Sequence, residues 1–198
     1  SAKRVLTLER FEGPKLRDAL EQGHSGPRLA RIALDTLFKQ IFVDGFFHAD
    51  PHPGNVLVLG TPAAPRLGLL DLGMVGRLTP RMRDLTADVM ICAARRDYEG
   101  IADAMLAIGS SATKVDRNAF RSEVASLADR YLGRQLKDIS TANLIGDLVR
   151  AANRFGLEIP ADFMLMGKAL MTVEGIGRQL DPRLDVLEAT RPLFLDLL

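Results

Sequence analysis

The stretch that decides the fold of this 198-residue chain is His48-Ala49-Asp50-Pro51-His52-Pro53-Gly54-Asn55, followed after two short apolar runs by Leu70-Asp71-Leu72-Gly73. The first stretch places a histidine, an aspartate and an asparagine in one loop. Its prolines restrict the backbone and its glycine permits a sharp bend, so these polar side chains can converge on one small volume. The second stretch places another aspartate in a flexible turn. Together they predict a polar site built from two loops.

The spacing of these residues is typical of phosphoryl transfer. The first stretch resembles the protein-kinase catalytic loop H-x-D-x-x-x-x-N. The second resembles the kinase D-F-G turn, with Leu72 in place of the aromatic residue and expected to keep its packing role. Aspartate and asparagine are common in turns, so any one of them alone carries little weight. The ordered set, after an amphipathic helix and around a hairpin, is a strong signal.

The ending His52-Pro53-Gly54-Asn55 resembles the UbiB/ADCK (AarF) family of atypical kinases more than ordinary protein kinases. Aminoglycoside- and choline-kinase-like proteins share the frame but usually lack this ending. Residues 5–13 resemble the strand and hinge of the UbiB family, and residues 168–176 with Leu180-Asp181-Pro182 resemble its late helical signature. The resemblance therefore extends well beyond the loop.

The resemblance implies a role for each polar residue of the two loops. Asp50 is expected to be the catalytic base, or the carboxylate that positions the nucleophile. Asn55 and Asp71 are expected to bind Mg²⁺ that bridges the phosphates of ATP. His48 is placed in the catalytic group and is expected to brace the Asp71 turn through a hydrogen bond rather than to transfer protons. Gly73 is expected to give the backbone freedom beside the metal ligand and to contact the nucleotide.

The resemblance also implies how the chain divides. Residues 1–13 would be the end of the last small-lobe strand and the hinge, where the backbone of Glu9, Arg10 and Phe11 contacts adenine. Without the resemblance, this segment is a simple edge strand and turn. Residues 14–198 would be the large, C-terminal lobe. A kinase-like fold also needs an upstream lysine, its glutamate partner and a loop over the phosphates. Only Lys3 precedes the hinge, so we expect that the N-lobe is absent and that catalysis by this piece alone is feeble.

The expected fold class is mainly α (α+β), a protein-kinase-like C-lobe with a small β-hairpin at the active site. A short helix over 14–22 and a long helix after Ser25 or Gly26 precede the catalytic loop 48–55. Strands over 55–59 and 66–70 form a hairpin that brings Asn55 near Asp71 in the turn 71–73. The helical region 80–198 contains helices near 80–95, 97–108, 116–132, 141–155, 161–179 and 185–197.

The hydrophobic pattern also predicts which side chains form the core. The long helix carries one apolar stripe at helical spacing, made of Leu29, Ile32, Ala33, Leu37, Ile41 and Phe42. Other side chains expected in the core are Phe46, Phe47, Cys92, Met164, Met166 and Met171. His24, in a glycine- and serine-rich turn, is expected to be solvated.

Composition narrows the function further. The 26 basic and 25 acidic residues nearly balance, so charge gives no argument for nucleic acid. A single cysteine excludes an internal disulfide or a cysteine-based metal site. His48 and His52 share a proline-containing loop rather than one helix face, which disfavours zinc. The chain has no apolar run of about 20 residues and no apparent leader. We therefore expect a cytoplasmic protein, and the resemblance adds peripheral association with a membrane.

Three functional hypotheses remain open. The first, implied by the resemblance, is an ATP-binding kinase or ATPase that supports isoprenoid-quinone (ubiquinone) biosynthesis, with membrane lipid or quinone-biosynthesis proteins as partners. The second is a small-molecule phosphotransferase of the aminoglycoside- or choline-kinase type, although the helical region shows no acidic cluster to bind such a substrate. The third is a non-catalytic kinase-like scaffold. Self-association through the lobe face is expected if the small lobe is missing, because that face would be apolar and exposed.

Overall fold

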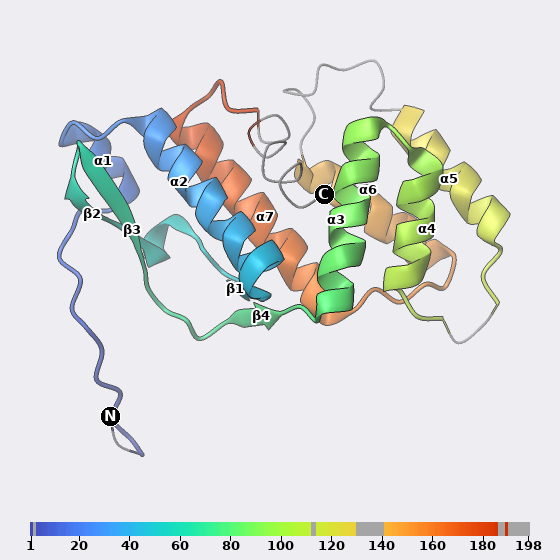
Figure 1. The fold of residues 1–198 in the computed structure, drawn as a ribbon, viewed down its shortest axis with the longest axis horizontal. Helices are drawn as coiled ribbons and strands as arrows, with labels where there is room; N and C mark the ends of the chain where they lie inside the picture. The colour runs from blue at the N-terminus through green and yellow to red at the C-terminus, as the bar shows by residue number, and fades with distance from the viewer. Residues whose placement is uncertain (2, 112–113, 130–140, 186–188, 190–198) are drawn as a thin grey trace.

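The structure is a computed structural model, and it describes residues 1, 3–111, 114–129, 141–185 and 189. Within these residues the chain is mostly helical with two small antiparallel strand pairs. In Figure 1 helix α1 and the β2–β3 hairpin lie at one end of the molecule, α4 and α5 lie at the other, and β1 and β4 lie between them. This agrees with the expected mainly helical fold and its small sheet.

The long helices α2 and α7 form the central layer. Helix α1, Leu16–Glu21, is short, and α2, Gly26–Phe38, continues into a π-helical segment, η1, Lys39–Asp44. Helix α7, Ala161–Leu180, runs alongside α2 (Figure 1). The predicted stripe of α2 is confirmed, since Leu29, Ala33, Leu37, Ile41 and Phe42 are buried and Ile32 is partly buried.

Two strand pairs hold the predicted loops. The hairpin is confirmed: β2, Val56–Thr61, pairs with β3, Ala64–Leu69, and the Leu70 N–H donates to the Asn55 carbonyl over 2.8 Å. The second pair was not predicted. It joins β1, Phe46–His48, to β4, Val75–Arg77. Three-residue strands carry too little alternation to be recognised, and each forms here because the other supplies its hydrogen-bond partners.

The predicted helices of the second half are confirmed where the structure describes them. They are α3, Pro80–Arg95; α4, Tyr98–Ile108; α5, Arg117–Asp129; α6, Thr141–Arg154; and α7. Side chains cap three of them, because Thr79, Asp97 and Asp116 accept backbone N–H groups of the first turns of α3, α4 and α5. The end of the helix predicted over 116–132 and most of the one predicted over 185–197 lie outside the described residues.

Three predictions of side-chain burial, for Phe46, Met164 and His24, are wrong. Phe47 is fully buried, but Phe46 is 41% exposed with the Arg77 guanidinium 4.8 Å above its ring centre. Neighbouring residues on a strand point to opposite faces, so only one of them can enter the core. Met164 is likewise exposed, whereas Met166 is buried. His24 is buried rather than solvated.

Two other side chains lie between core and surface. Met171 on α7 is partly buried. Cys92 is also partly buried and packs against the cluster between α4, α5 and α6. Burial is the main cause that raises the pKa of its thiol, and the charge of the nearby Asp97 carboxylate raises this pKa further. The predicted place of Cys92 in the core is therefore only partly correct.

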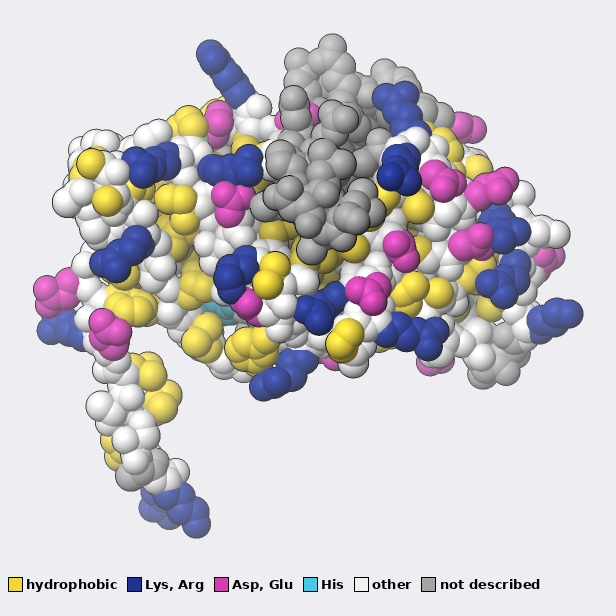
Figure 2. All heavy atoms as spheres, viewed as in Figure 1, with side chains coloured by type: hydrophobic (Ala, Val, Ile, Leu, Met, Phe, Trp, Pro, Cys, Tyr) yellow, Lys and Arg dark blue, Asp and Glu magenta, His cyan; other side chains and the backbone are white. Residues whose placement is uncertain are grey.

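The N-terminal segment does not form the predicted strand over residues 5–9. Val5, Leu6 and Leu8 are between 61% and 74% exposed, and the segment runs away from the body of the molecule (Figures 1 and 2). An apolar run becomes a strand only where a sheet edge supplies backbone partners. Closer to the body, the Val58 N–H donates to the Pro14 carbonyl over 2.8 Å, which attaches the segment to the hairpin.

Replacing Phe47 with alanine should destabilise the fold far more than the same change at Phe46. The Phe47 ring packs directly on the backbone of Gly76, where an added Cβ would lie 2.2 Å from its Cζ atom. Phe47→Ala should therefore reduce the free energy of unfolding by about 3–5 kcal/mol. Phe46→Ala should cost about 1 kcal/mol or less, since its ring is partly solvated. Urea denaturation followed by circular dichroism measures both, and equal losses would contradict this assignment of the two faces.

Candidate functional site

The two predicted loops lie side by side because of the strand pairing. Residues 49–55 join β1 to β2, and residues 70–74 join β3 to β4. Since β1 pairs with β4 and β2 with β3, both loops are held at each end by the same two strand pairs. At one end of the loops the Ala49 N–H donates to the Met74 carbonyl over 3.0 Å, and at the other end the Leu70 N–H donates to the Asn55 carbonyl over 2.8 Å. The structure thus places Asp50 and Asn55 in one loop and Asp71 in the adjacent one.

His48 lies between the two ends of the Asp71 turn. Its imidazole is buried, with Nε2 3.1 Å from the Leu70 carbonyl oxygen and Nδ1 3.3 Å from the Met74 carbonyl oxygen. In the tautomer with a proton on Nε2, the ring donates to Leu70 and accepts the Asp50 N–H on Nδ1, at 3.4 Å. A ring enclosed in this way is suited to hold the turn. It is poorly placed to exchange protons with a substrate.

Asp71 sits in a strained turn. Its φ of 53° lies in the left-handed region, which costs a residue with a Cβ on the order of 1–2 kcal/mol. The carboxylate faces solvent, and a Cβ added at Gly73 would lie 3.1 Å from Asp71 Oδ1. Gly73 therefore keeps the space beside the carboxylate open. Leu72 is 59% exposed, so the prediction that it keeps the packing role of the D-F-G aromatic residue is wrong.

The catalytic-loop stretch is held by its own polar groups. Asn55 is buried, and its Nδ2 donates to the Asp50 carbonyl over 3.3 Å. In the same stretch, the His52 N–H donates to the Asp50 carbonyl, and the Asn55 N–H donates to the His52 carbonyl, both over 2.8 Å. The exposed His52 ring accepts the Gly54 N–H on Nδ1 over 3.0 Å. His52 thus caps the short turn Pro53–Asn55, a local structural contact that the sequence analysis did not assign.

Lys168 is a site residue that sequence reasoning missed. Its Nζ lies 2.8 Å from Oδ1 of Asp50, with the two side chains 46% and 33% exposed. The hydrogen bond from Lys168 is the main reason that the pKa of the Asp50 carboxyl lies below its ordinary value. Lys168 belongs to α7, far from the loop in sequence, and it opens the late helical signature noted above. A lysine in a helix is ordinarily solvated, so the position of Lys168 in the sequence did not indicate a contact with Asp50.

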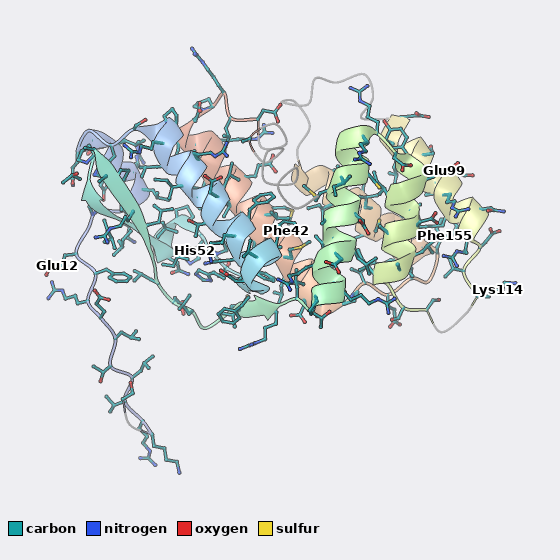
Figure 3. All side chains as sticks on the ribbon, viewed as in Figure 1. Glu12, Phe42, His52, Glu99, Lys114 and Phe155 are labelled. Carbon is teal, nitrogen blue, oxygen red and sulfur yellow. The ribbon has the colours of Figure 1, made fainter. Side chains whose placement is uncertain are left out.

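The predicted hinge residues lie beside the hairpin rather than in the two loops. The Glu9 and Arg10 side chains are exposed, and Arg10 makes a solvent-facing ion pair with Glu12 at 3.6 Å. Phe11 is partly buried, and its ring lies against Gly68 of β3. Figure 3 labels Glu12 and His52, which both lie at the hairpin end of the molecule, with Glu99 and Phe155 at the other. The structure therefore joins this segment to the hairpin.

The polar groups of the two loops fit a magnesium ion shared with phosphates. Mg²⁺ is commonly held by one or two protein oxygen ligands, with phosphate oxygens and water completing its shell. Asp71 supplies an exposed carboxylate next to the open space at Gly73, and Asn55 supplies an amide oxygen. Within the described residues there is no group of three His, Cys, Asp or Glu side chains that could hold a metal alone. Asp71 and Asn55 alone supply too few ligands for Mg²⁺, so other oxygen donors would have to complete its shell.

Removing Lys168 should raise the pKa of Asp50. A carboxyl group with a lowered pKa in the folded state adds stability above its ordinary pKa, here 3.8, and loses it as the pH falls through the folded value. The ion pair should thus be intact at neutral pH and break below pH 3.8. In Lys168→Met, carbon-13 NMR of the side-chain carboxyl should show Asp50 titrating closer to 3.8. Lys39→Met, which removes the exposed pair of Lys39 with Asp44 at 2.7 Å, is the control and should leave Asp50 unchanged.

Comparison with known families agrees with this arrangement. Residues 1–105 match the ABC1 atypical kinase-like domain, and residues 124–185 match the UbiB helical domain. A "Probable protein kinase UbiB" of Marinobacter nauticus is 36% identical over 98% of this chain. A protein of the same name from Azotobacter vinelandii is 34% identical over 96% of it.

The chain spans only 36% of the length of each of these curated relatives. The matched domain nevertheless covers the strand pairs and both loops of the site, and the relatives align along nearly the whole chain. On these grounds the chain belongs to the UbiB/ADCK (AarF) family of ABC1 atypical kinase-like proteins.

Proposed function

We propose that this chain is the large, C-terminal lobe of an ATP-binding atypical kinase or ATPase. The observation that carries the proposal is the double attachment of two loops, which holds Asp50 and Asn55 beside the turn of Asp71. Phosphoryl transfer depends mainly on positioning and on charge stabilisation, so a fixed set of two carboxylates and an amide is suited to it. ATP with Mg²⁺ would supply the phosphoryl group.

Each residue then has a task of its own. Asp71 and Asn55 hold Mg²⁺, and Gly73 leaves room for the phosphates beside the Asp71 carboxylate. Asp50 accepts the proton of the attacking hydroxyl or water, which its ionised state allows. His48 fixes the distance between the two loops. The backbone of residues 9–11 contacts adenine.

We infer that residues 1–13 lead from a small lobe that supplies the remaining catalytic parts, namely the upstream lysine, its glutamate partner and a loop over the phosphates. The 36% coverage of the relatives supports this inference. The exposed Val5, Leu6 and Leu8 also support it, because a neighbouring strand would cover them. Without that lobe, activity should be low, and the same exposed surface should favour self-association.

For the complete protein we propose a role in isoprenoid-quinone biosynthesis, with a lipid or another protein of that process as a partner. The support is family membership and the name of the relatives, "Probable protein kinase UbiB".

We further propose that the protein is cytoplasmic and associates peripherally with a membrane. None of the helices in the described ranges has the length and apolar character to cross a bilayer. Figure 2 shows basic and acidic side chains interspersed over the face in view.

The test is Mg²⁺-dependent ATP turnover by the longest natural chain that contains these 198 residues. Asp71→Asn should abolish Mg²⁺-dependent nucleotide binding, while asparagine accepts the left-handed backbone and so preserves the fold. Asp50→Asn should retain nucleotide binding and lower turnover by roughly 10²–10⁴-fold, as expected for loss of a general base. Phosphate release and calorimetry measure the two effects.

The matched control is Asp84→Asn, which removes an exposed carboxylate from α3, away from both loops, and should change neither quantity. Full turnover in both loop variants would contradict the proposal. Nucleotide binding without turnover in the unmodified chain would instead indicate a non-catalytic scaffold.

A further inference from the structure

The ion pair between Lys168 and Asp50 is the feature of the site that the proposed mechanism leaves unused. Among the described residues, Lys168 provides the only ion pair recorded for Asp50 or Asp71, at 2.8 Å. The other recorded lysine pair, Lys39 with Asp44, lies in η1 and involves neither loop. The Lys168 side chain is 46% exposed, so solvent reaches it although its ammonium group contacts the carboxylate. A ligand arriving at Asp50 from solvent would meet this charge.

Helix α7 holds Lys168 in a fixed place. The residues on either side of it, Gly167 and Ala169, are buried, and Ala169 is packed in the main core cluster. One end of the helix is tied to the sheet as well, because the Arg77 N–H of β4 donates to the Asp162 carboxylate over 3.4 Å. The helix backbone is therefore rigid relative to both loops. The four-carbon lysine stem remains free to move its end by a few ångströms.

The charges of the site require a cation at this position. Asp50 and Asp71 are acidic, and a nucleotide triphosphate would bring further negative charge to the same volume. Asp71 and Asn55 would hold Mg²⁺, which would offset part of that charge. On the Asp50 side the described residues offer the Lys168 ammonium. Its three N–H donors can bind a carboxylate and a phosphate oxygen together or in turn.

We propose that Lys168 binds the terminal phosphate of the nucleotide, leaving Asp50 free to act as the base. This rests on the proposed function, since it deepens the role of the same site. In the transfer step the acceptor oxygen forms a bond to the terminal phosphorus, and the bond from that phosphorus to the bridging oxygen breaks. The acceptor proton goes to Asp50, and ADP leaves with the electron pair of the broken bond. Lys168 neutralises charge on the transferred group, and without nucleotide it pairs with Asp50.

The proposal predicts a loss of discrimination between triphosphate and diphosphate. Calorimetry on the full natural chain should compare Mg²⁺ complexes of β,γ-imido-ATP, which resists hydrolysis, and of ADP. Lys168→Ala should weaken binding of the imido-ATP by about tenfold, the usual scale for one charge-assisted hydrogen bond. Binding of ADP should change less than about twofold. Lys168→Arg keeps the charge and should retain most of the preference, and Lys39→Ala, the matched control, should retain all of it.

A second measurement uses the unmutated protein and so does not depend on how a variant folds. Mild acetylation with acetic anhydride, followed by mass spectrometry, gives the modification rate of each lysine. Magnesium imido-ATP should slow acetylation of Lys168 more than magnesium ADP does, and neither should change the rate at Lys39.

The outcomes separate this proposal from the one on which it rests. Equal weakening of both nucleotides by Lys168→Ala, or weakening of neither, would overturn the role of Lys168 and leave the ATP-binding function intact. Equal protection of Lys168 by both nucleotides would do the same. If the unmodified chain binds neither nucleotide in the presence of Mg²⁺, both proposals fail.

Discussion

The arrangement of the site depends on one buried imidazole. With a proton on Nε2, the His48 ring donates to the Leu70 carbonyl at one end of the turn that carries Asp71, while the Ala49 N–H donates to the Met74 carbonyl at the other end. The same ring accepts the backbone N–H of Asp50. A left-handed aspartate is costly, and contacts on both sides of it keep the turn in that form. Because His48 is also the last residue of β1, any shift of that strand would be transmitted to both carboxylates.

Helices α2 and α7 support the site. Helix α2 leads into β1 through η1, and its buried stripe packs along α7. The guanidinium of Arg83 in α3 donates to the carbonyl of Val43 near the end of η1, over 2.6 Å. Strand β1, which leads into the loop 49–55, therefore follows a helical segment whose end is held by α3. This explains how a short stretch rich in proline and glycine can keep polar side chains in fixed positions.

Much of this fold could be predicted from the sequence, and the features that could not be predicted share a cause. The helices follow from apolar residues at helical spacing, and the hairpin follows from two apolar runs around a short turn. These signals are local. The β1–β4 pair, the exposed side of Phe46 and the ion pair of Lys168 depend on contacts between distant parts of the chain. Without those contacts, Phe46 reads as another core residue and Lys168 as a solvated one.

The ion pair between α7 and the loop has a consequence for how the molecule divides. The ABC1 match ends at residue 105 and the UbiB helical match begins at residue 124, so the two units are separate in sequence. Asp50 belongs to the first unit and Lys168 to the second. The boundary between the units is therefore not a boundary of the site. A chimera that took its helical unit from a relative would therefore also take the side chain opposite Asp50 from that relative.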